Sequence, residues 1–188
     1  MSKCNILDIT KIDASKINNE TFGIDTNVLY WMHYSKGSYA NNYQTSTYPK
    51  FLSDLIVAGN KLYTTMYNIS ELLYIIERNE YKQYKNNNNC NISKKKYRGI
   101  ANQRESLKKE YLSVLNQVES IYSIHDFEIN IVGVKNFTAE LSNHMCDNFD
   151  YQIIDELKKQ GISNFITDDS DFKSIDDINL YTANSRIK

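Results

Sequence analysis

The chain has 188 residues, of which 41% are hydrophobic, so it is long enough to bury a core within one domain. No run approaches the roughly 18 apolar residues of a membrane span, and the polar N-terminal segment lacks the apolar stretch of a secretion signal. The formal net charge of −1 excludes a generally basic nucleic-acid binder. Three widely spaced cysteines without zinc-site spacing indicate a reduced, cytoplasmic setting.

The first half of the chain predicts an N-terminal arm and then alternating strands and helices. Residues 1–20 are polar and mixed in charge, which favours an irregular arm. Apolar runs and helical spacing predict strands at 22–24 and 61–66 and helices at 27–34 and 71–84. Between them, Pro49 is expected to open a further helix that Gly59 and Asn60 end. Two polar segments, 37–48 and 86–99, are expected to be loops.

The second half continues the same alternation. A long helix is expected at 103–121, shorter helices at 137–145 and 150–160, and strands at 129–134, 164–167 and 178–182. The sequence therefore predicts an α/β fold with a central, mostly parallel five-stranded sheet flanked by helices. We expect one domain at 21–188 with a basic, helical insertion at about 80–125. Nine Lys or Arg and one acid lie between Lys82 and Lys109, whereas ten acids and five cations follow from Glu140 onward.

Carboxylates follow strand ends or begin helices at several places in the chain. They are Asp25, Glu71, Asp150, Asp169 and Asp171. Strand ends and helix starts meet at one edge of a parallel sheet, so we expect these side chains to share one pocket. Hard oxygen ligands suit Mg²⁺ or Mn²⁺, and such ions on carboxylates commonly serve phosphodiester hydrolysis. Without a cation, the like charges should raise the pKa of some of these groups.

Each acid also fits a purely structural role. Asp25 and Asp150 could cap helices, and Glu71 could complete a capping box with Asn68. The acids from Asp168 to Asp171 could form an ordinary acidic turn. Their joint occurrence favours a shared metal site, with Thr26, Asn27 and Thr167 as groups that orient the carboxylates. Asn27 fits a simple helix start equally well.

Four segments resemble the motifs of the PIN domain, a family best represented by the toxin ribonucleases of bacterial toxin–antitoxin pairs. The opening motif is Asp25-Thr26-Asn27-Val28-Leu29, Glu71 matches the second acid, and Asp150-Tyr151-Gln152-Ile153-Ile154 matches the third. The run 166–172 resembles the closing Thr-x-Asp-x-Asp-Phe motif, with Asp169 and Asp171 aligned and Asp168 in the variable position. The resemblance covers residues 22–182. The arm and the long segment between Glu71 and Asp150 depart from compact members.

The resemblance implies an Mg²⁺- or Mn²⁺-dependent endoribonuclease, often dimeric and often inhibited by an antitoxin protein. It implies that Asp25, Glu71, Asp150 and Asp169 are catalytic and that Asp171 joins them in binding metal. Because RNA is polyanionic, the basic segment with Lys94, Lys95, Lys96 and Arg98 is expected to bind its backbone. That segment could instead be a solvated lysine-rich surface. A non-catalytic PIN-like module that binds nucleic acid or protein, and a flap-nuclease relative acting on DNA, remain the alternatives.

Overall fold

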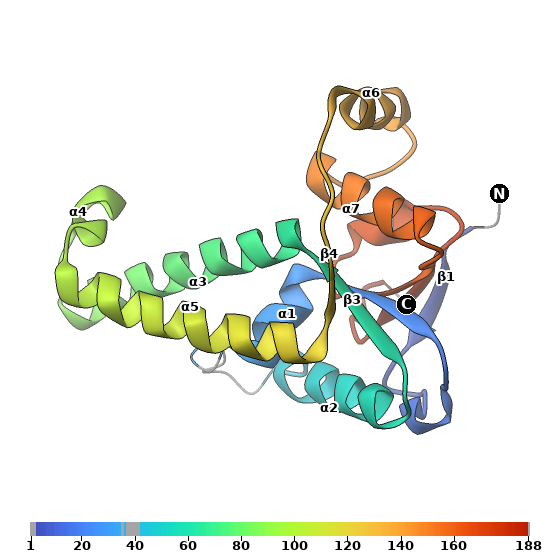
Figure 1. The fold of residues 1–188 in the computed structure, drawn as a ribbon, viewed down its shortest axis with the longest axis horizontal. Helices are drawn as coiled ribbons and strands as arrows, with labels where there is room; N and C mark the ends of the chain where they lie inside the picture. Colours follow the sequence, from blue (N-terminus) through green and yellow to red (C-terminus); the bar gives the residue numbers. More distant parts are fainter. Residues whose placement is uncertain (1–2, 35, 37–41, 188) are drawn as a thin grey trace.

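Six parallel strands form one sheet with helices on both faces in the computed structural model, which describes residues 3–34, 36 and 42–187 (Figure 1). The strands are β1 (Asn5–Asp8), β2 (Thr21–Ile24), β3 (Lys61–Thr65), β4 (Ser123–His125), β5 (Asn164–Ile166) and β6 (Asn179–Thr182). Their spatial order is β1-β6-β5-β2-β3-β4. The α/β class and the parallel sheet are confirmed, but the sheet has six strands and not five.

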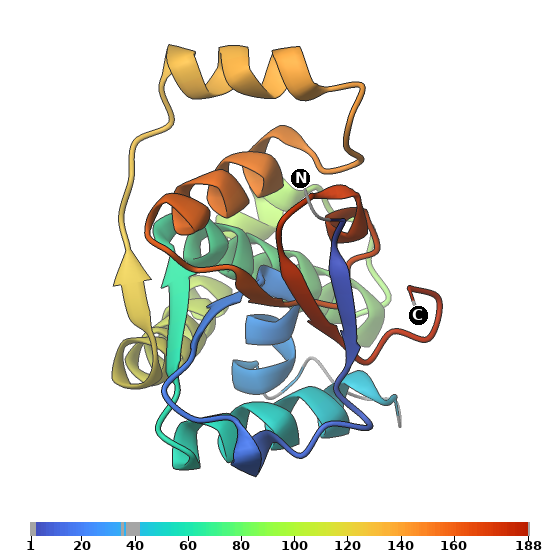
Figure 2. The same ribbon diagram turned by 90° about the vertical axis from the view of Figure 1, so that its right-hand side faces the viewer.

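Seven α-helices and two short 3₁₀ helices are found in the described residues. They are α1 (Thr26–His33), α2 (Gln44–Val57), α3 (Met66–Asn87), α4 (Lys94–Arg98), α5 (Ala101–Ile121), α6 (Ile131–Glu140), α7 (Asn148–Lys159), η1 (Ala14–Lys16) and η2 (Asp171–Ser174). Helices α1 and α2 lie on one side of the sheet and α7 on the other (Figure 2). Among residues 3–34, 36 and 42–187, no helix is long and apolar enough to cross a lipid bilayer.

Two hydrophobic cores lie on the two faces of the sheet, and β5 serves both. Ile166 packs with α1, α2 and α3 in the first core, while its neighbour Phe165 packs with α7 in the second. This alternation follows from the two-residue repeat of a strand. On β2, Gly23 leaves room for the second core: a Cβ there would lie 2.9 Å from two ring carbons of Phe165 and 3.1 Å from Leu157.

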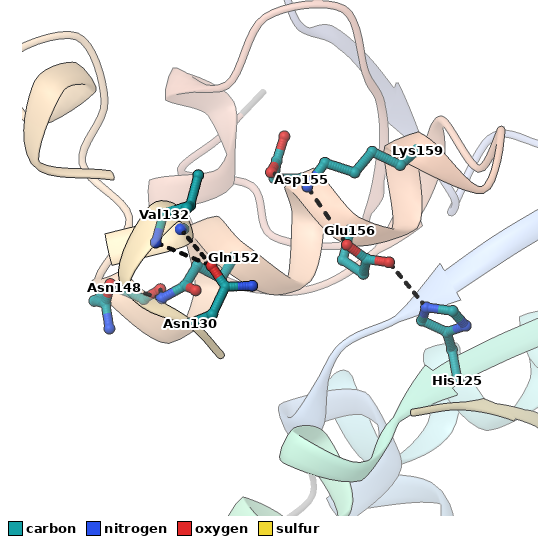
Figure 3. A network of polar contacts seen from close by, with 9 residues as sticks. His125, Asn130, Val132, Asn148, Gln152, Asp155, Glu156 and Lys159 are labelled. Atoms are coloured by element: carbon teal, nitrogen blue, oxygen red, sulfur yellow. Dashed lines mark hydrogen bonds and ion pairs between the residues drawn. The ribbon is translucent and has the colours of Figure 1, made fainter. Parts of the chain in front are cut away.

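Helix α6 lies against α7, where the ring centroid of Phe137 lies 5.8 Å from that of Tyr151; Figure 3 shows the polar contacts within each of the two helices. Asn130 begins α6 by accepting hydrogen bonds from the backbone amides of Val132 and Gly133. Gly133 lies so close to Gln152 of α7 that a Cβ there would be 2.5 Å from the Gln152 amide oxygen. None of the α6 residues is fully buried, and Ile131 and Val132 are exposed on the surface.

Helices α3 and α5 form a long antiparallel arm that projects from the sheet, with α4 at its far end (Figure 1). Glu77 of α3 holds α4 in place, although its side chain is only 6% exposed. Arg98 donates two hydrogen bonds to its carboxylate, at 2.7 and 2.5 Å, and Lys94 lies at 3.1 Å. The hydrogen bond from Arg98, and then that from Lys94, lower the pKa of Glu77 to about 2.

The strand predictions contain two errors, and the second of them accounts for the sixth strand. Residues 129–134 are not a strand, because Asn130 caps α6 in this stretch, and the strand lies earlier, as β4. The segment expected to be an irregular arm contains β1, which adds to the edge of the sheet by backbone pairing with β6. That pairing needs no continuous apolar run, and Asn5 and Asn179 reinforce it with a side-chain hydrogen bond.

Helix boundaries differ from the predictions at several points; the helices expected at 71–84 and 137–145, for example, are α3 (Met66–Asn87) and α6 (Ile131–Glu140). Pro49 lies inside α2 and does not open it, since side chains from the first turns of α2 are anchored at the sheet edge. Of the expected loop at 37–48, residues 37–41 lie outside the described part of the chain and 44–48 are helical. The segment 86–99 contains α4, because Tyr97 is buried against the rings of Tyr81 and Tyr84.

Replacing Gly23 with alanine should destabilise the fold by about 1–3 kcal/mol, because the added methyl group overpacks against the ring of Phe165. Urea denaturation followed by circular dichroism measures the change. In a Phe165→Leu background the same substitution should cost less, since the ring atoms nearest to the new methyl group are gone. Equal costs in the two backgrounds would contradict this account of Gly23.

Candidate functional site

The candidate site lies where the order of the strands reverses. From β2 the chain runs to β3 and β4 on one side, then returns to β5 on the other side of β2. In open parallel sheets, ligands bind outside the carboxyl ends of the strands at such a reversal. Here the two ends are joined directly, since the backbone amide of Asp25 donates to the carbonyl oxygen of Ile166 at 3.2 Å.

Asp25 is held at this reversal by three donors. The backbone amide of Thr26 donates to one carboxylate oxygen at 2.6 Å, so Asp25 also caps α1. The other oxygen accepts hydrogen bonds from the Asn27 amide and the Thr167 hydroxyl, both at 2.5 Å. Thr26, Asn27 and Thr167, which were expected to orient the carboxylates, therefore all contact Asp25.

Glu71 reaches the same place from the second turn of α3. It accepts a hydrogen bond from the Thr26 hydroxyl at 2.8 Å, and that hydroxyl accepts one from the Asn68 amide at 3.1 Å. The capping box expected for Asn68 and Glu71 is wrong, because α3 begins earlier, at Met66. Its capping box is formed by Thr65 and Asn68, which leaves Glu71 outside the cap.

The remaining acids come from α7 and from the segment after β5. Asp150 lies in the first turn of α7, and the cap of that helix is Asp147. The backbone amide of Asp169 donates to the Thr167 hydroxyl at 2.9 Å, which ties Asp169 to the group that holds Asp25. Asp171 begins η2, and its amide donates to the Asp169 carboxylate at 2.9 Å.

Burial and mutual repulsion act on two of these acids. Burial raises the pKa of Asp25 from 3.8 to about 7; hydrogen bonds from Thr167 and Thr26 oppose the rise, and the charges of Glu71 and Asp169 add to it. Burial also raises the pKa of Asp150 to about 8, with further contributions from the charges of Asp25, Asp147, Glu71 and Asp169. The acids therefore lie close enough to repel one another, at one edge of the sheet.

Asp168, which stands in the variable position of the closing motif, is a structural anchor. Its carboxylate accepts hydrogen bonds from the hydroxyls of Tyr43 and Tyr48 and from the Gln44 amide. Tyr48 is fully buried. Asp168 thus fastens the start of α2 to the end of β5. Its position in the motif gave no signal of this, because the partners lie more than a hundred residues away.

Two hollows open beside the acids, and their other lining residues were also missed. One, of about 370 Å³, is lined by Glu71 and Asp150 together with Tyr67 and Phe149. The other, of about 350 Å³, is lined by Asp168 and Asp169 together with Trp31, Asn184 and Arg186. The position of Phe149 directly before Asp150 was the available signal for the first hollow.

The donor set fits a hard divalent cation in charge and ligand type. Within 3–34, 36 and 42–187, no group of three or more Asp, Glu, His or Cys side chains has the arrangement of a metal site. Mg²⁺ keeps several waters and takes one or two carboxylates directly, so it needs no complete protein cage. Asp25 with either Glu71 or Asp169 could hold such an ion.

The four basic residues expected to bind RNA divide into two pairs. Lys94 and Arg98 are engaged with Glu77, as described above. Lys95 and Lys96 are exposed on α4. Lys94 and Arg98 reach Glu77, which lies six residues along α3 from Glu71, or about 9 Å at the helical rise per residue.

Comparison with known proteins supports the fold and leaves the family open. No family model matches the chain, and no curated protein matches it. Among solved structures, the chain matches one described as VapBC2 from Rickettsia felis bound to a DNA fragment from their promoter. The TM-score is 0.54 and the identity 18%, over 86% of this chain and 98% of that chain. At this identity the likeness shows a shared, PIN-like fold.

In metal-free protein, thermal stability should fall as the pH rises from about 5 to about 8. The folded state holds protons on Asp25 and Asp150 in this range, whereas the unfolded chain releases them near pH 4, so deprotonation favours unfolding. Melting temperatures measured in chelator across this range test the effect. Asp25→Asn should flatten the profile, while Asp54→Asn, on an exposed part of α2, should not. An unchanged slope in Asp25→Asn would contradict the assignment.

Proposed function

We propose that this protein is a divalent-metal-dependent ribonuclease that hydrolyses phosphodiester bonds in RNA. The observation that carries the proposal is Asp25, which is fixed by three donors at the strand reversal while burial, and then the charges of Glu71 and Asp169, raise its pKa. A cation would relieve this repulsion, which gives the site a strong preference for positive charge. The PIN-like fold supports the proposal by analogy.

In this mechanism, Asp25 is the central ligand and its three donors keep it in one orientation. Asp150 and Asp169 add negative charge on either side of it. A bound Mg²⁺ or Mn²⁺ ion would lower the pKa of a water and offset the charge that builds on the phosphate. Glu71, fixed by the Thr26 hydroxyl, would orient that water and accept its proton at the carboxylate oxygen that Thr26 does not occupy.

The RNA backbone is proposed to follow the arm toward α4. Lys95 and Lys96 are the candidates for phosphate contacts there, because Lys94 and Arg98 neutralise Glu77. These contacts would add affinity without reaching the bond that is cut.

A protein partner of the antitoxin type, and a second copy of this chain, are proposed as binding partners. The matched structure is by its description a VapBC2 complex on promoter DNA, which supports a partner of that kind. Helix α6 offers a surface, because Ile131 is 66% exposed and Val132 61% exposed.

A non-catalytic nucleic-acid-binding module is the second candidate. It is favoured by the absence, in the described residues, of three acids arranged as a complete metal shell. Such a module would bind RNA through the same site and leave it uncut.

Asp25→Asn should reduce RNA cleavage at least about 100-fold, because it removes the central charge of the site while keeping its size. A labelled RNA incubated with Mg²⁺ or Mn²⁺ and resolved on a gel measures the rate. Wild-type activity should be lost in excess chelator and return with either metal. Asp54→Asn is the matched control and should cleave normally. Full activity of Asp25→Asn, or activity that survives chelation, would reject the proposal.

Replacing Lys95 and Lys96 together with alanine should weaken RNA binding and make its affinity less dependent on salt, since about two fewer counterions are released. Filter binding at several salt concentrations, with Asp25→Asn as the background, gives both values. Lys61→Ala, an exposed cation at the start of β3, should leave the salt dependence unchanged. If the double variant binds RNA with the same salt dependence as the background protein, α4 does not contact the RNA backbone.

A further inference from the structure

The acids of the candidate site lie between the two hollows described above. We propose that these hollows are base-binding subsites for the two unpaired nucleotides on either side of the cut. One base would stack beside Phe149 and Tyr67, and the other beside Trp31, with Arg186 holding the adjoining phosphate. This inference rests on the proposed ribonuclease function and names the residues that would select unpaired over paired RNA.

The first hollow has a fixed aromatic wall next to two of the acids. Phe149 is 54% exposed, which is unusual for a large aromatic side chain that the core could bury. Its ring centroid lies 6.1 Å from that of Tyr67. Tyr67 is itself held by Phe127, at 5.0 Å, and by the backbone amide of Ile129, which donates to its hydroxyl. Aromatic side chains in this position accept unstacked bases of any sequence.

The second hollow combines an aromatic ring with a cation. The ring of Trp31 stacks on Tyr48 at 5.4 Å, and Tyr48 is fixed by its hydrogen bond to Asp168. Arg186 lines the same hollow and is exposed. Within the described part of the chain Arg186 forms no ion pair, although Asp168 and Asp169 line the same hollow. Its guanidinium group is therefore free to bind a phosphate.

The order of these groups fits a strand of RNA that crosses the sheet edge. Glu71 and Asp150 border the first hollow, Asp169 borders the second, and Asp25 interacts electrostatically with all three. A phosphate above Asp25 would therefore have one base on each side. In a duplex the bases are stacked and paired inside the helix and cannot enter the hollows, so the substrate must be unpaired at the cut.

Trp31 provides the measurement, because it is the one tryptophan in the chain. In the Asp25→Asn background with Mg²⁺, a six-nucleotide single-stranded RNA should quench its fluorescence, and the same RNA in a duplex should bind at least tenfold more weakly. Phe149→Ala and Arg186→Ala should each raise the Kd for the single strand roughly 5- to 100-fold, as expected for the loss of one stacked base or one phosphate contact. Arg186→Lys should recover part of the affinity.

Two exposed positions away from the hollows serve as controls. Val57→Ala and Lys61→Ala remove an apolar and a basic side chain and should leave the Kd unchanged. Circular dichroism confirms that each variant is folded. The proposed subsites are refuted if Phe149→Ala and Arg186→Ala bind RNA like the controls, or if single strand and duplex bind equally. The ribonuclease function is still supported in that case, provided that wild-type protein cleaves RNA. If both variants lose binding but no metal supports cleavage, the subsites are supported and the ribonuclease function is refuted.

Discussion

The hydrogen bond between the Thr167 hydroxyl and the Asp25 carboxylate joins the two halves of the sheet at the point where they reverse direction. Asp25 follows β2 and caps α1, while Thr167 follows β5, so the contact fixes two strands and a helix together. The charge of Asp25 is favoured by the α1 N-terminus and its three donors, and opposed by burial and by neighbouring acids. The opposition is stronger, as the raised pKa shows. The structure therefore keeps a local electrostatic strain that the remaining contacts must hold in place.

The sequence predicted best the central strands, which lie between the two hydrophobic cores. Ile24 and Ile166 are fully or almost fully buried, and the acids that follow them could be identified from their position alone. Strand β1 was not predicted, because an edge strand needs little apolar character and this one begins with the polar residue Asn5. Residues 129–134 were misread because their apolar side chains match a strand pattern, although in α6 none of them reaches a core.

Parts of the site depend on contacts that no local pattern encodes. Thr26 was expected to orient the Asp25 carboxylate, and its backbone amide does contact it. The Thr26 hydroxyl also joins α1 to α3, because it donates to Glu71 and accepts from Asn68. Glu77 lies in the helix expected at 71–84, before the basic segment, and nothing in its sequence surroundings indicated that it would be buried. In the structure this one acid is buried among three cations, and their ion pairs hold α4 against the arm. Tertiary pairing, which composition cannot reveal, decided both outcomes.

The separation of 142 residues between Asp25 and Thr167 has a consequence for the newly made chain. During synthesis, β2 emerges early and can pair with β3, but its other neighbour, β5, is added only near the end. Closing so long a loop carries an entropic cost, and parallel pairing between distant strands forms slowly. The group of acids can therefore assemble only after nearly the whole chain has left the ribosome. A truncated product that lacks β5 cannot form it.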